Sequence, residues 1–219
     1  MTDSAISKNT TNNNGIRSPF YIVEEFLSPL LCEEIIDICD FTVPDLNKEG
    51  KVVSTIRSSE RSEAIIYDRL SSLLPDIQAY YQFQYKGTES MMFEWYPTGS
   101  KGVMGSENSN FVRGKWLRTK HRDITGVLFL CDYQDAPSFE QEYEVYGGKL
   151  EFPQHAFGFN PRRGTLILFP SDPHFINFTA DIRFGDLFQS RIQIAADKPY
   201  LYDPSMFPGN YTQWFTSNL

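Results

Sequence analysis

The amino-acid sequence predicts an α+β domain in which two helices precede a set of short strands that form a sandwich or a barrel. Three observations lead to this prediction. The chain of 219 residues is 41% hydrophobic and 22% charged, which suits one folded domain. Aromatic residues make up 15% of the chain, and aromatic side chains pack well on a pleated sheet. Two segments with helical periodicity come first, and strand-length apolar runs separated by turn residues follow them.

The pattern indicates one domain with a short N-terminal arm. Residues 1–17 are polar and rich in Asn, Thr and Ser, so we expect a disordered arm followed by a single domain over residues 18–219. The arm lacks the basic start and apolar middle of a signal peptide, and no apolar run is long enough to span a membrane. We therefore expect a cytoplasmic protein with no membrane partner.

The first part of the domain predicts one strand and two helices. Phe20 to Phe26 suggests a short strand. Ser28 fits the N-cap of a helix over Pro29 to Cys39, because its hydroxyl can accept a backbone hydrogen bond and proline suits the first turn. A second helix is expected over Ser62 to Leu74, and Pro75 either bends it or starts a further helical stretch.

From Ser90 onward the pattern changes from helices to strands. Apolar or alternating runs of strand length occur at Met91 to Tyr96, Ile124 to Asp132, Lys149 to Phe152, Thr165 to Phe169 and Leu187 to Ala195. The stretch from Gly99 to Gly114 is rich in Gly, Ser and Asn and is expected to be a long loop. The acidic segment from Asp132 to Glu144 is expected to be a solvated excursion between strands.

The charge balance disfavours polyanionic partners. With 20 Lys and Arg against 28 Asp and Glu, the net charge is −8, and the overall field repels phosphate backbones. Nucleic acid is therefore not expected as a partner, although a local basic patch is compatible with this total.

A short motif before the run at Ile124 suggests half of a metal site. In an extended strand, residues i and i+2 project from the same face, so His121 and Asp123 would present an imidazole and a carboxylate side by side. His174 follows a buried strand and could complete the set. Two imidazoles and one carboxylate leave one face of a metal open, which suits non-haem Fe(II) oxygenases. Taken alone, His121 and Asp123 also fit an exposed polar pair, and His174 also fits a turn residue.

The segments around these residues resemble the Fe(II)- and 2-oxoglutarate-dependent dioxygenases, specifically the prolyl-4-hydroxylase-like branch. The resemblance covers nearly the whole expected domain and rests on the order of its motifs. These are Phe26-Leu27-Ser28-Pro29, Tyr96-Pro97-Thr98-Gly99, His121-Arg122-Asp123, Gly147-Gly148-Lys149-Leu150-Glu151-Phe152-Pro153, the Pro161 to Pro170 segment and His174. The resemblance implies a double-stranded β-helix, or jelly roll, with the N-terminal helices packed on one sheet.

The resemblance also implies an activity and a set of cofactors. Fe(II) would be held by His121, Asp123 and His174, with 2-oxoglutarate as co-substrate, O2 as oxidant and ascorbate as a further candidate cofactor. The expected reaction is hydroxylation of an unidentified substrate with release of succinate and CO2. A peptidyl proline and a small molecule are both candidate substrates, because fold and metal do not fix the substrate.

An anionic co-substrate requires a basic anchor for its distal carboxylate, and arginine suits this role because it can bind a carboxylate through two hydrogen bonds. Arg191 begins an alternating run and is the first choice. Arg183 lies nine positions after His174, a spacing closer to that of typical prolyl hydroxylases, and is the alternative. Tyr96 is expected to add a hydroxyl hydrogen bond to the co-substrate.

Two other interpretations compete with the dioxygenase. The first is a non-catalytic jelly-roll binding module that uses the same pocket for a small ligand or partner. The second is a cupin-like enzyme with another divalent metal and no 2-oxoglutarate. Cupins usually use more histidines, and the chain contains only three.

Overall fold

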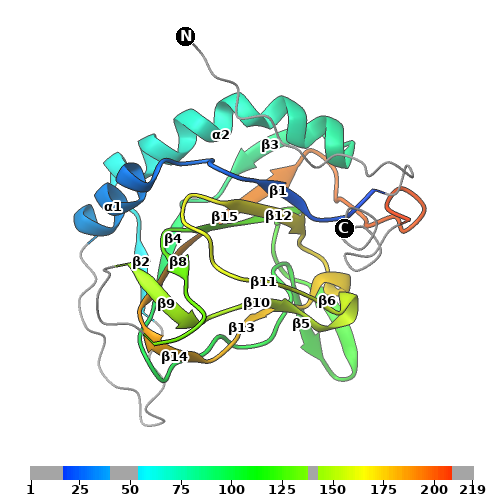
Figure 1. Ribbon diagram of the computed structural model, residues 1–219. Helices are drawn as coiled ribbons and strands as arrows, with labels where there is room; N and C mark the ends of the chain where they lie inside the picture. Colours follow the sequence, from blue (N-terminus) through cyan, green and yellow to red (C-terminus); the bar gives the residue numbers. More distant parts are fainter. Residues whose placement is uncertain (1–16, 40–53, 138–142, 209–219) are drawn as a thin grey trace.

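The computed structural model describes residues 17–39, 54–137 and 143–208 (Figure 1). Residues 1–16 of the expected arm lie outside the described ranges. Arg17, the last residue of that arm, is described: its guanidinium carbon lies 4.2 Å from the centre of the Tyr80 ring. Within the described ranges, neither α-helix combines the length and apolar character needed to cross a lipid bilayer.

Both predicted helices are present, and the second is longer than predicted. Helix α1 (Pro29–Ile38) begins at Ser28, whose hydroxyl oxygen accepts a hydrogen bond from the Leu31 backbone N–H. Helix α2 (Glu60–Tyr81) continues through Pro75. A proline costs a helix one backbone hydrogen bond, but the turns after Pro75 bury apolar and aromatic side chains that offset this loss. These side chains are Ile77, Tyr80 and Tyr81.

The largest sheet has seven strands. Its hydrogen-bonded order is β1-β12-β7-β15-β4-β2, and β3 pairs with β15 beside this path. The strands are β1 (Tyr21–Val23), β2 (Ser54–Arg57), β3 (Tyr85–Thr88), β4 (Met92–Tyr96), β7 (Ile124–Phe129), β12 (Leu166–Pro170) and β15 (Leu187–Ala196). Strands β2 and β3 had no counterpart in the sequence prediction, because both are short and have little apolar periodicity.

The remaining strands form three smaller sheets, and Figure 1 shows α1 and α2 on one side of the large sheet and two of these sheets on the other. One contains β8 (Asp132–Tyr133), β9 (Glu144–Gly147) and β14 (Ile182–Gly185). Another contains β10 (Leu150–Phe152), β11 (Phe157–Phe159) and β13 (Phe178–Thr179). The third is a hairpin of β5 (Ser109–Val112) and β6 (Lys115–Arg118). Two short 3-10 helices, η1 (Pro153–His155) and η2 (Pro173–Phe175), complete the set.

Two buried clusters lie on opposite faces of the large sheet. Ile124 and Leu128 of β7 belong to the cluster that also contains the buried side chains of α1 and α2. Val127 and Phe129 belong to the cluster that contains the side chains of the smaller sheets. This division follows from the two-residue period of a strand. The same alternation directs the odd-numbered residues of β15 into the space between the large sheet and the smaller sheets.

The stretch from Gly99 to Gly114 is only partly the loop that the sequence predicted. Its last part forms β5, which pairs with β6 through a two-residue turn. Arg113 and Gly114 occupy that turn with φ values of 49° and 80°. Two consecutive positive φ angles are characteristic of the turn type that matches the twist of a hairpin. The prediction of a loop over this part was therefore wrong.

Candidate ligand-binding pocket

The structure gives Asp123 a structural role at the edge of the large sheet. The side chain is buried, and its carboxylate accepts hydrogen bonds from the backbone N–H groups of Ala196, at 3.0 Å, and Tyr200, at 2.7 Å. Arg118 of β6 adds an ion pair at 2.8 Å. Both carboxylate oxygens are thus engaged. Asp123 ties together the hairpin, the end of β15 and the segment that follows it.

His121 does not lie beside Asp123 on a strand face. Strand β7 begins at Ile124, so residues 121–123 precede it, although the Asp123 backbone N–H still donates to the Ile194 carbonyl and its carbonyl accepts from the Ser171 N–H. The His121 side chain is exposed. Asp123, by contrast, is buried, so the two side chains of the His-x-Asp motif have different surroundings.

His174 lies in η2 and is held by Asp172. Its Nδ1 is 2.8 Å from Asp172 Oδ1, and the side chain is 68% exposed. The second Asp172 oxygen is buried without a hydrogen-bond partner. Asp172 and His174 together could supply only two side-chain ligands to a metal ion. Across the described ranges, no group of three or more His, Cys, Asp or Glu residues could hold a metal ion. The described ranges thus do not bring His121, Asp123 and His174 together as one such group, and their role as iron ligands stays a prediction.

Arg191 lies in a pocket on the inner face of the large sheet. In the antiparallel register Gln189 faces Glu94, so Arg191 is the diagonal neighbour of Glu94 across the strand pair. The Arg191 Nε donates to both carboxylate oxygens of Glu94, at 3.1 and 3.0 Å. Its Nη1 donates to Glu107, which lies in the segment before β5, and more weakly to the Asn177 side-chain oxygen at 3.4 Å.

Backbone pairing brings Glu107 to this position. Gly105 and Asn177 form an isolated antiparallel bridge, with both N–H to carbonyl hydrogen bonds present. Residues of the segment from Gly102 to Glu107 then line the pocket. Glu107 then accepts further hydrogen bonds from Asn177 Nδ2, at 3.3 Å, and Gln193 Nε2, at 3.0 Å.

The ion pairs determine the charge state of the pocket. Burial acts to lower the pKa of Arg191, but the carboxylates of Glu107 and Glu94 outweigh it and hold that pKa above its ordinary value. Burial likewise acts to raise the pKa of Glu107, and Arg191 with the Asn177 and Gln193 hydrogen bonds lowers it below its ordinary value. Arg191 is therefore a fixed cation flanked by two anions, and its positive charge is already compensated.

Tyr96 lines the same pocket, whereas Arg183 does not. The Tyr96 hydroxyl donates to Glu94 Oε2 at 3.3 Å. Burial, followed by the Glu94 charge, raises the pKa of Tyr96 to about 12, so the phenol is protonated at neutral pH. Arg183 is exposed on β14 and donates to the Tyr146 hydroxyl at 3.2 Å. Of the two candidate anchors, only Arg191 faces the pocket.

The pocket has a volume of about 430 Å³. Its lining includes three carboxylates and two guanidinium groups, so the formal charge of the lining is −1. These charged residues are Glu89, Glu94, Glu107, Arg122 and Arg191. Arg122 Nε and Nη2 both donate to the Glu89 carboxylate, so Arg122, like Arg191, is already paired with an acidic side chain. Each cation in the lining is thus matched by an anion.

Sequence reasoning found Arg191 and Tyr96 but missed the residues that neutralise Arg191. Glu94 had a detectable signal, because it lies between Met92 and Tyr96 on one face of an otherwise apolar strand. Glu107 and Asn177 had none. Their role depends on the bridge between Gly105 and Asn177, which joins segments far apart in the sequence.

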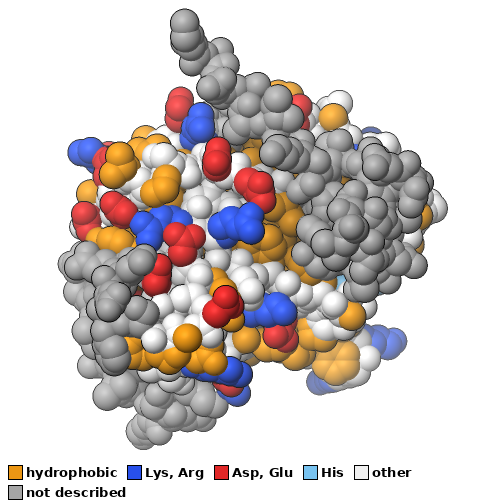
Figure 2. All heavy atoms as spheres, in the orientation of Figure 1, with side chains coloured by type: hydrophobic (Ala, Val, Ile, Leu, Met, Phe, Trp, Pro, Cys, Tyr) orange, Lys and Arg blue, Asp and Glu red, His pale blue; other side chains and the backbone are white. Residues whose placement is uncertain are grey.

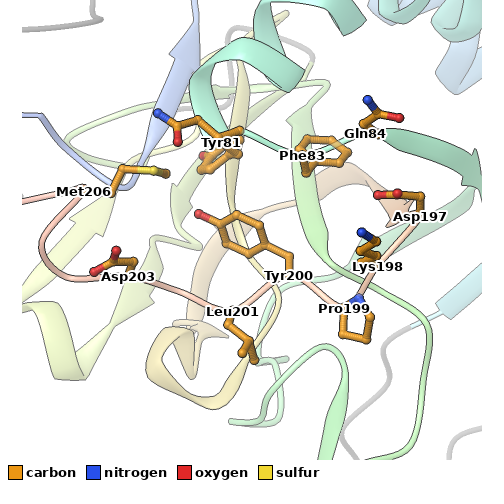
Figure 3. Close-up of a pocket in the computed structure, with 11 residues that line it drawn as sticks. Tyr81, Phe83, Gln84, Asp197, Lys198, Pro199, Tyr200, Leu201, Asp203 and Met206 are labelled. Atoms are coloured by element: carbon orange, nitrogen blue, oxygen red, sulfur yellow. The ribbon is translucent and has the colours of Figure 1, made fainter.

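A second, more open cavity of about 710 Å³ lies at the end of α2 (Figure 3). Figure 3 shows Tyr200 projecting into it between Tyr81 and the turn that carries Asp203. Its lining is a mixture of backbone turns and surface side chains, and among the described residues it contains none of the predicted site residues. The pocket around Arg191 is therefore the candidate site.

Comparison with known proteins places the fold. No family model matches the sequence, and no curated protein sequence is similar to it. Solved structures do match. The viral collagen prolyl hydroxylase of Paramecium Bursaria Chlorella virus-1, in complex with 2-oxoglutarate, aligns with a TM-score of 0.62 and 15% identity, covering 82% of this chain and 96% of that one.

Two further solved structures give the same answer. A prolyl-4-hydroxylase of Pseudomonas putida aligns with a TM-score of 0.57 and 13% identity, over 82% of this chain and 94% of that one. HygX of Streptomyces hygroscopicus, with nickel and 2-oxoglutarate bound, aligns with a TM-score of 0.52 and 10% identity, over 84% and 85%. The chain therefore has the jelly-roll fold of the 2-oxoglutarate-dependent oxygenases, and the resemblance to the prolyl-hydroxylase-like branch is confirmed at the level of the fold.

Proposed function

We propose that the protein is a ligand-binding module built on the oxygenase fold, and that its pocket takes a small polar ligand that is neutral or cationic. One observation carries the proposal: the cation that faces the pocket, Arg191, is already bound by Glu94 and Glu107. In the oxygenase interpretation, an arginine at this place would be left for the co-substrate.

The charge of the lining supports a neutral or cationic ligand. A dicarboxylate would have to approach the partly buried carboxylates of Glu94 and Glu107 and compete with them for the Arg191 guanidinium group. The repulsion between like charges in a poorly solvated site is large enough to decide specificity. A neutral ligand instead finds hydrogen-bonding groups at little electrostatic cost. These include the Tyr96 hydroxyl and the side chains of Asn177, Thr179 and Gln193.

A second candidate function is the Fe(II)- and 2-oxoglutarate-dependent dioxygenase that the sequence resembles. The fold favours it, because neighbouring structures with this fold contain 2-oxoglutarate, and one also contains nickel. Hydroxylation of a peptidyl proline or a small molecule would then be the reaction. The engagement of Asp123 with backbone N–H groups and Arg118 argues against this candidate.

A single four-carbon series tests the proposed ligand class. Succinate, succinamide and 1,4-diaminobutane have similar length but carry negative, zero and positive charge. In isothermal titration calorimetry, we expect succinamide and the diamine to bind more tightly than succinate. Tighter binding of succinate than of both other compounds would contradict the proposal.

A pair of variants gives the matched control. Glu107→Gln and Glu94→Gln each remove one of the charges that compensate Arg191, so each should increase the affinity for succinate and for 2-oxoglutarate. Glu24→Gln, at an exposed ion pair with Arg162 away from the pocket, should not change either affinity.

Anaerobic reconstitution separates the two candidate functions. The protein is mixed with Fe(II) and 2-oxoglutarate, and the visible spectrum is examined for a metal-to-ligand charge-transfer band. We expect no band, and no succinate after O2 is admitted. A band together with succinate formation would establish the dioxygenase and overturn the binding module.

A further inference from the structure

The hairpin of β5 and β6 exposes aromatic and apolar side chains together with basic ones. Phe111 is 61% exposed and Trp116 is 37% exposed, although large apolar residues are usually buried. Figure 2 shows orange and blue side chains side by side at the lower right, over the place where Figure 1 draws β5 and β6. The hairpin therefore presents a surface that folding alone does not explain.

The two faces of the hairpin differ in chemistry. Phe111 and Trp116 are directly opposite each other across the strands, so they share one face. Their ring centres are 5.2 Å apart and their planes are tilted by 57°. The next pair on this face, Ser109 and Arg118, adds a guanidinium group. Leu117 and Lys115 lie on the opposite face with their partners Asn110 and Val112.

The hairpin is also a concentrated source of positive charge in an acidic protein. Residues 108–122 include no Asp or Glu. The basic residues Arg113, Lys115 and Lys120 are exposed and form no ion pair within the described part of the chain. Arg118 pairs with Asp123 at the foot of the hairpin. Beyond about 8–10 Å, salt at physiological strength screens the acidic residues elsewhere on the molecule.

We propose that this hairpin binds single-stranded nucleic acid. Unpaired bases can stack on exposed aromatic rings, and arginine side chains at the turn and on the ring face of the hairpin can contact the phosphates. An acidic peptide would use the cations but not the aromatic pair, so the combination favours a nucleic acid strand. Duplex DNA is a poorer fit, because its bases are stacked on one another and are not available to Phe111 and Trp116.

The net charge of −8 does not exclude this interaction. The sequence prediction that disfavoured nucleic acid used the net charge of the whole chain and not the charge of any one surface. The fold instead collects basic residues on one projecting hairpin and pairs the pocket arginines internally. A strand bound at the tip of the hairpin would encounter the local charge first.

Fluorescence polarisation with a fluorescein-labelled twelve-nucleotide oligothymidylate tests the proposal. We expect binding that weakens between about 50 and 200 mM salt, as for other phosphate-contacting proteins. Trp116→Leu keeps an apolar side chain but removes the stacking surface, and should weaken binding roughly tenfold. Trp116→Phe keeps an aromatic ring and should retain most of the affinity. Leu117→Ala, on the opposite face, is the matched control and should bind as the unchanged protein does.

Charge variants test the phosphate contacts separately. Arg113→Gln, at the turn of the hairpin, should reduce the slope of log affinity against log salt by about 0.7 if Arg113 contacts one phosphate of a single strand. Absence of binding at low salt, or equal affinity of Trp116→Leu and the unchanged protein, would overturn the proposal. Equally tight binding of a labelled oligoglutamate peptide would also overturn it, and would identify the hairpin as a general surface for acidic partners.

Discussion

The pocket and the hairpin use basic side chains in opposite ways, although only one residue, Asn108, separates Glu107 of the pocket from Ser109 of β5. In the pocket, the Arg191 side chain is 14% exposed and two carboxylates bind it. On the hairpin, Arg113 and Lys115 are exposed and form no ion pair among the described residues. A buried charge must be compensated within the protein, whereas an exposed charge is stabilised by water.

The charges of the pocket therefore contribute mainly to stability, whereas those of the hairpin are available to bind a partner. Removing one member of a buried ion pair leaves an uncompensated charge in a poorly solvated site, which is strongly destabilising. Removing an exposed charge changes the folded state little but alters the local field that a partner meets. We therefore expect pocket variants to change the free energy of unfolding and hairpin variants to change binding.

The largest effect is expected for Arg191→Leu. This substitution leaves the largely buried carboxylates of Glu94 and Glu107 without their shared cation, and should reduce the free energy of unfolding by about 3–5 kcal/mol. Urea denaturation followed by circular dichroism measures the change.

A combined variant provides the control for this result. Arg191→Leu with Glu94→Gln and Glu107→Gln removes all three charges and should recover much of the lost stability. If Arg191→Leu alone unfolds at the same urea concentration as the unchanged protein, the ion pairs of Arg191 with Glu94 and Glu107 do not stabilise the fold.

Asp123 joins the hairpin to the large sheet. A smaller loss in the free energy of unfolding, about 2–3 kcal/mol, is expected for Asp123→Ala. The variant leaves the backbone N–H groups of Ala196 and Tyr200 without acceptors and Arg118 without its ion pair. His121→Ala is the matched control, because His121 is exposed, and should change stability by less than about 0.5 kcal/mol. If both residues were metal ligands, both variants should instead abolish stabilisation of the protein by added Fe(II).

Much of the fold was predictable because its central strands have strong local patterns. The sequences of β7 and β12 are mostly apolar, and that of β15 alternates between apolar and polar residues. Ser28 followed by Pro29 is a typical start of a helix and predicts α1. The extension of α2 beyond Pro75 was not predictable, because it depends on tertiary contacts. One of them is the hydrogen bond from the Tyr81 hydroxyl to the Leu168 carbonyl, at 2.8 Å.

The candidate site was less predictable than the fold. Arg191 and Tyr96 share an inward face through strand alternation, which the sequence pattern contains. The partners of Arg191 are set by the register between β4 and β15 and by the bridge between Gly105 and Asn177. Such long-range pairing leaves no local pattern. The role of His121 and Asp123 as metal ligands stays a prediction, because both residues precede β7 and the strand pattern does not determine their geometry.

The pH dependence of stability offers an intermediate test of the pocket. The pKa of Glu107 is lower in the folded protein than its ordinary value, because Arg191 and two amide hydrogen bonds outweigh the effect of burial. A depressed pKa contributes stability above about pH 4.5, and this contribution is lost as the pH falls through the folded-state pKa.

Glu107→Gln should therefore be less stable than the unchanged protein at pH 7, by about 1–3 kcal/mol. The difference should shrink as the pH falls below about 4.5, where carboxylates take up protons. Urea midpoints measured across this range provide the test. Glu89→Gln, at a more exposed ion pair with Arg122, should cost no more than about 1 kcal/mol at pH 7. A Glu107→Gln difference that stays constant with pH would show that the Glu107 charge does not contribute to stability.

The smallest effect is expected at the aromatic pair of the hairpin, and it completes the contrast with the pocket. Phe111 and Trp116 are cross-strand neighbours, and such pairs stabilise a sheet by about 0.2–1 kcal/mol. A double-mutant cycle with Phe111→Ala, Trp116→Ala and the combined variant isolates that coupling from the loss of exposed surface. Because both rings already contact water, the coupling free energy should stay within this range even though the same variants weaken oligothymidylate binding. A coupling energy as large as the loss in Arg191→Leu would mean that the rings are part of the folded core, and that their exposure does not serve recognition.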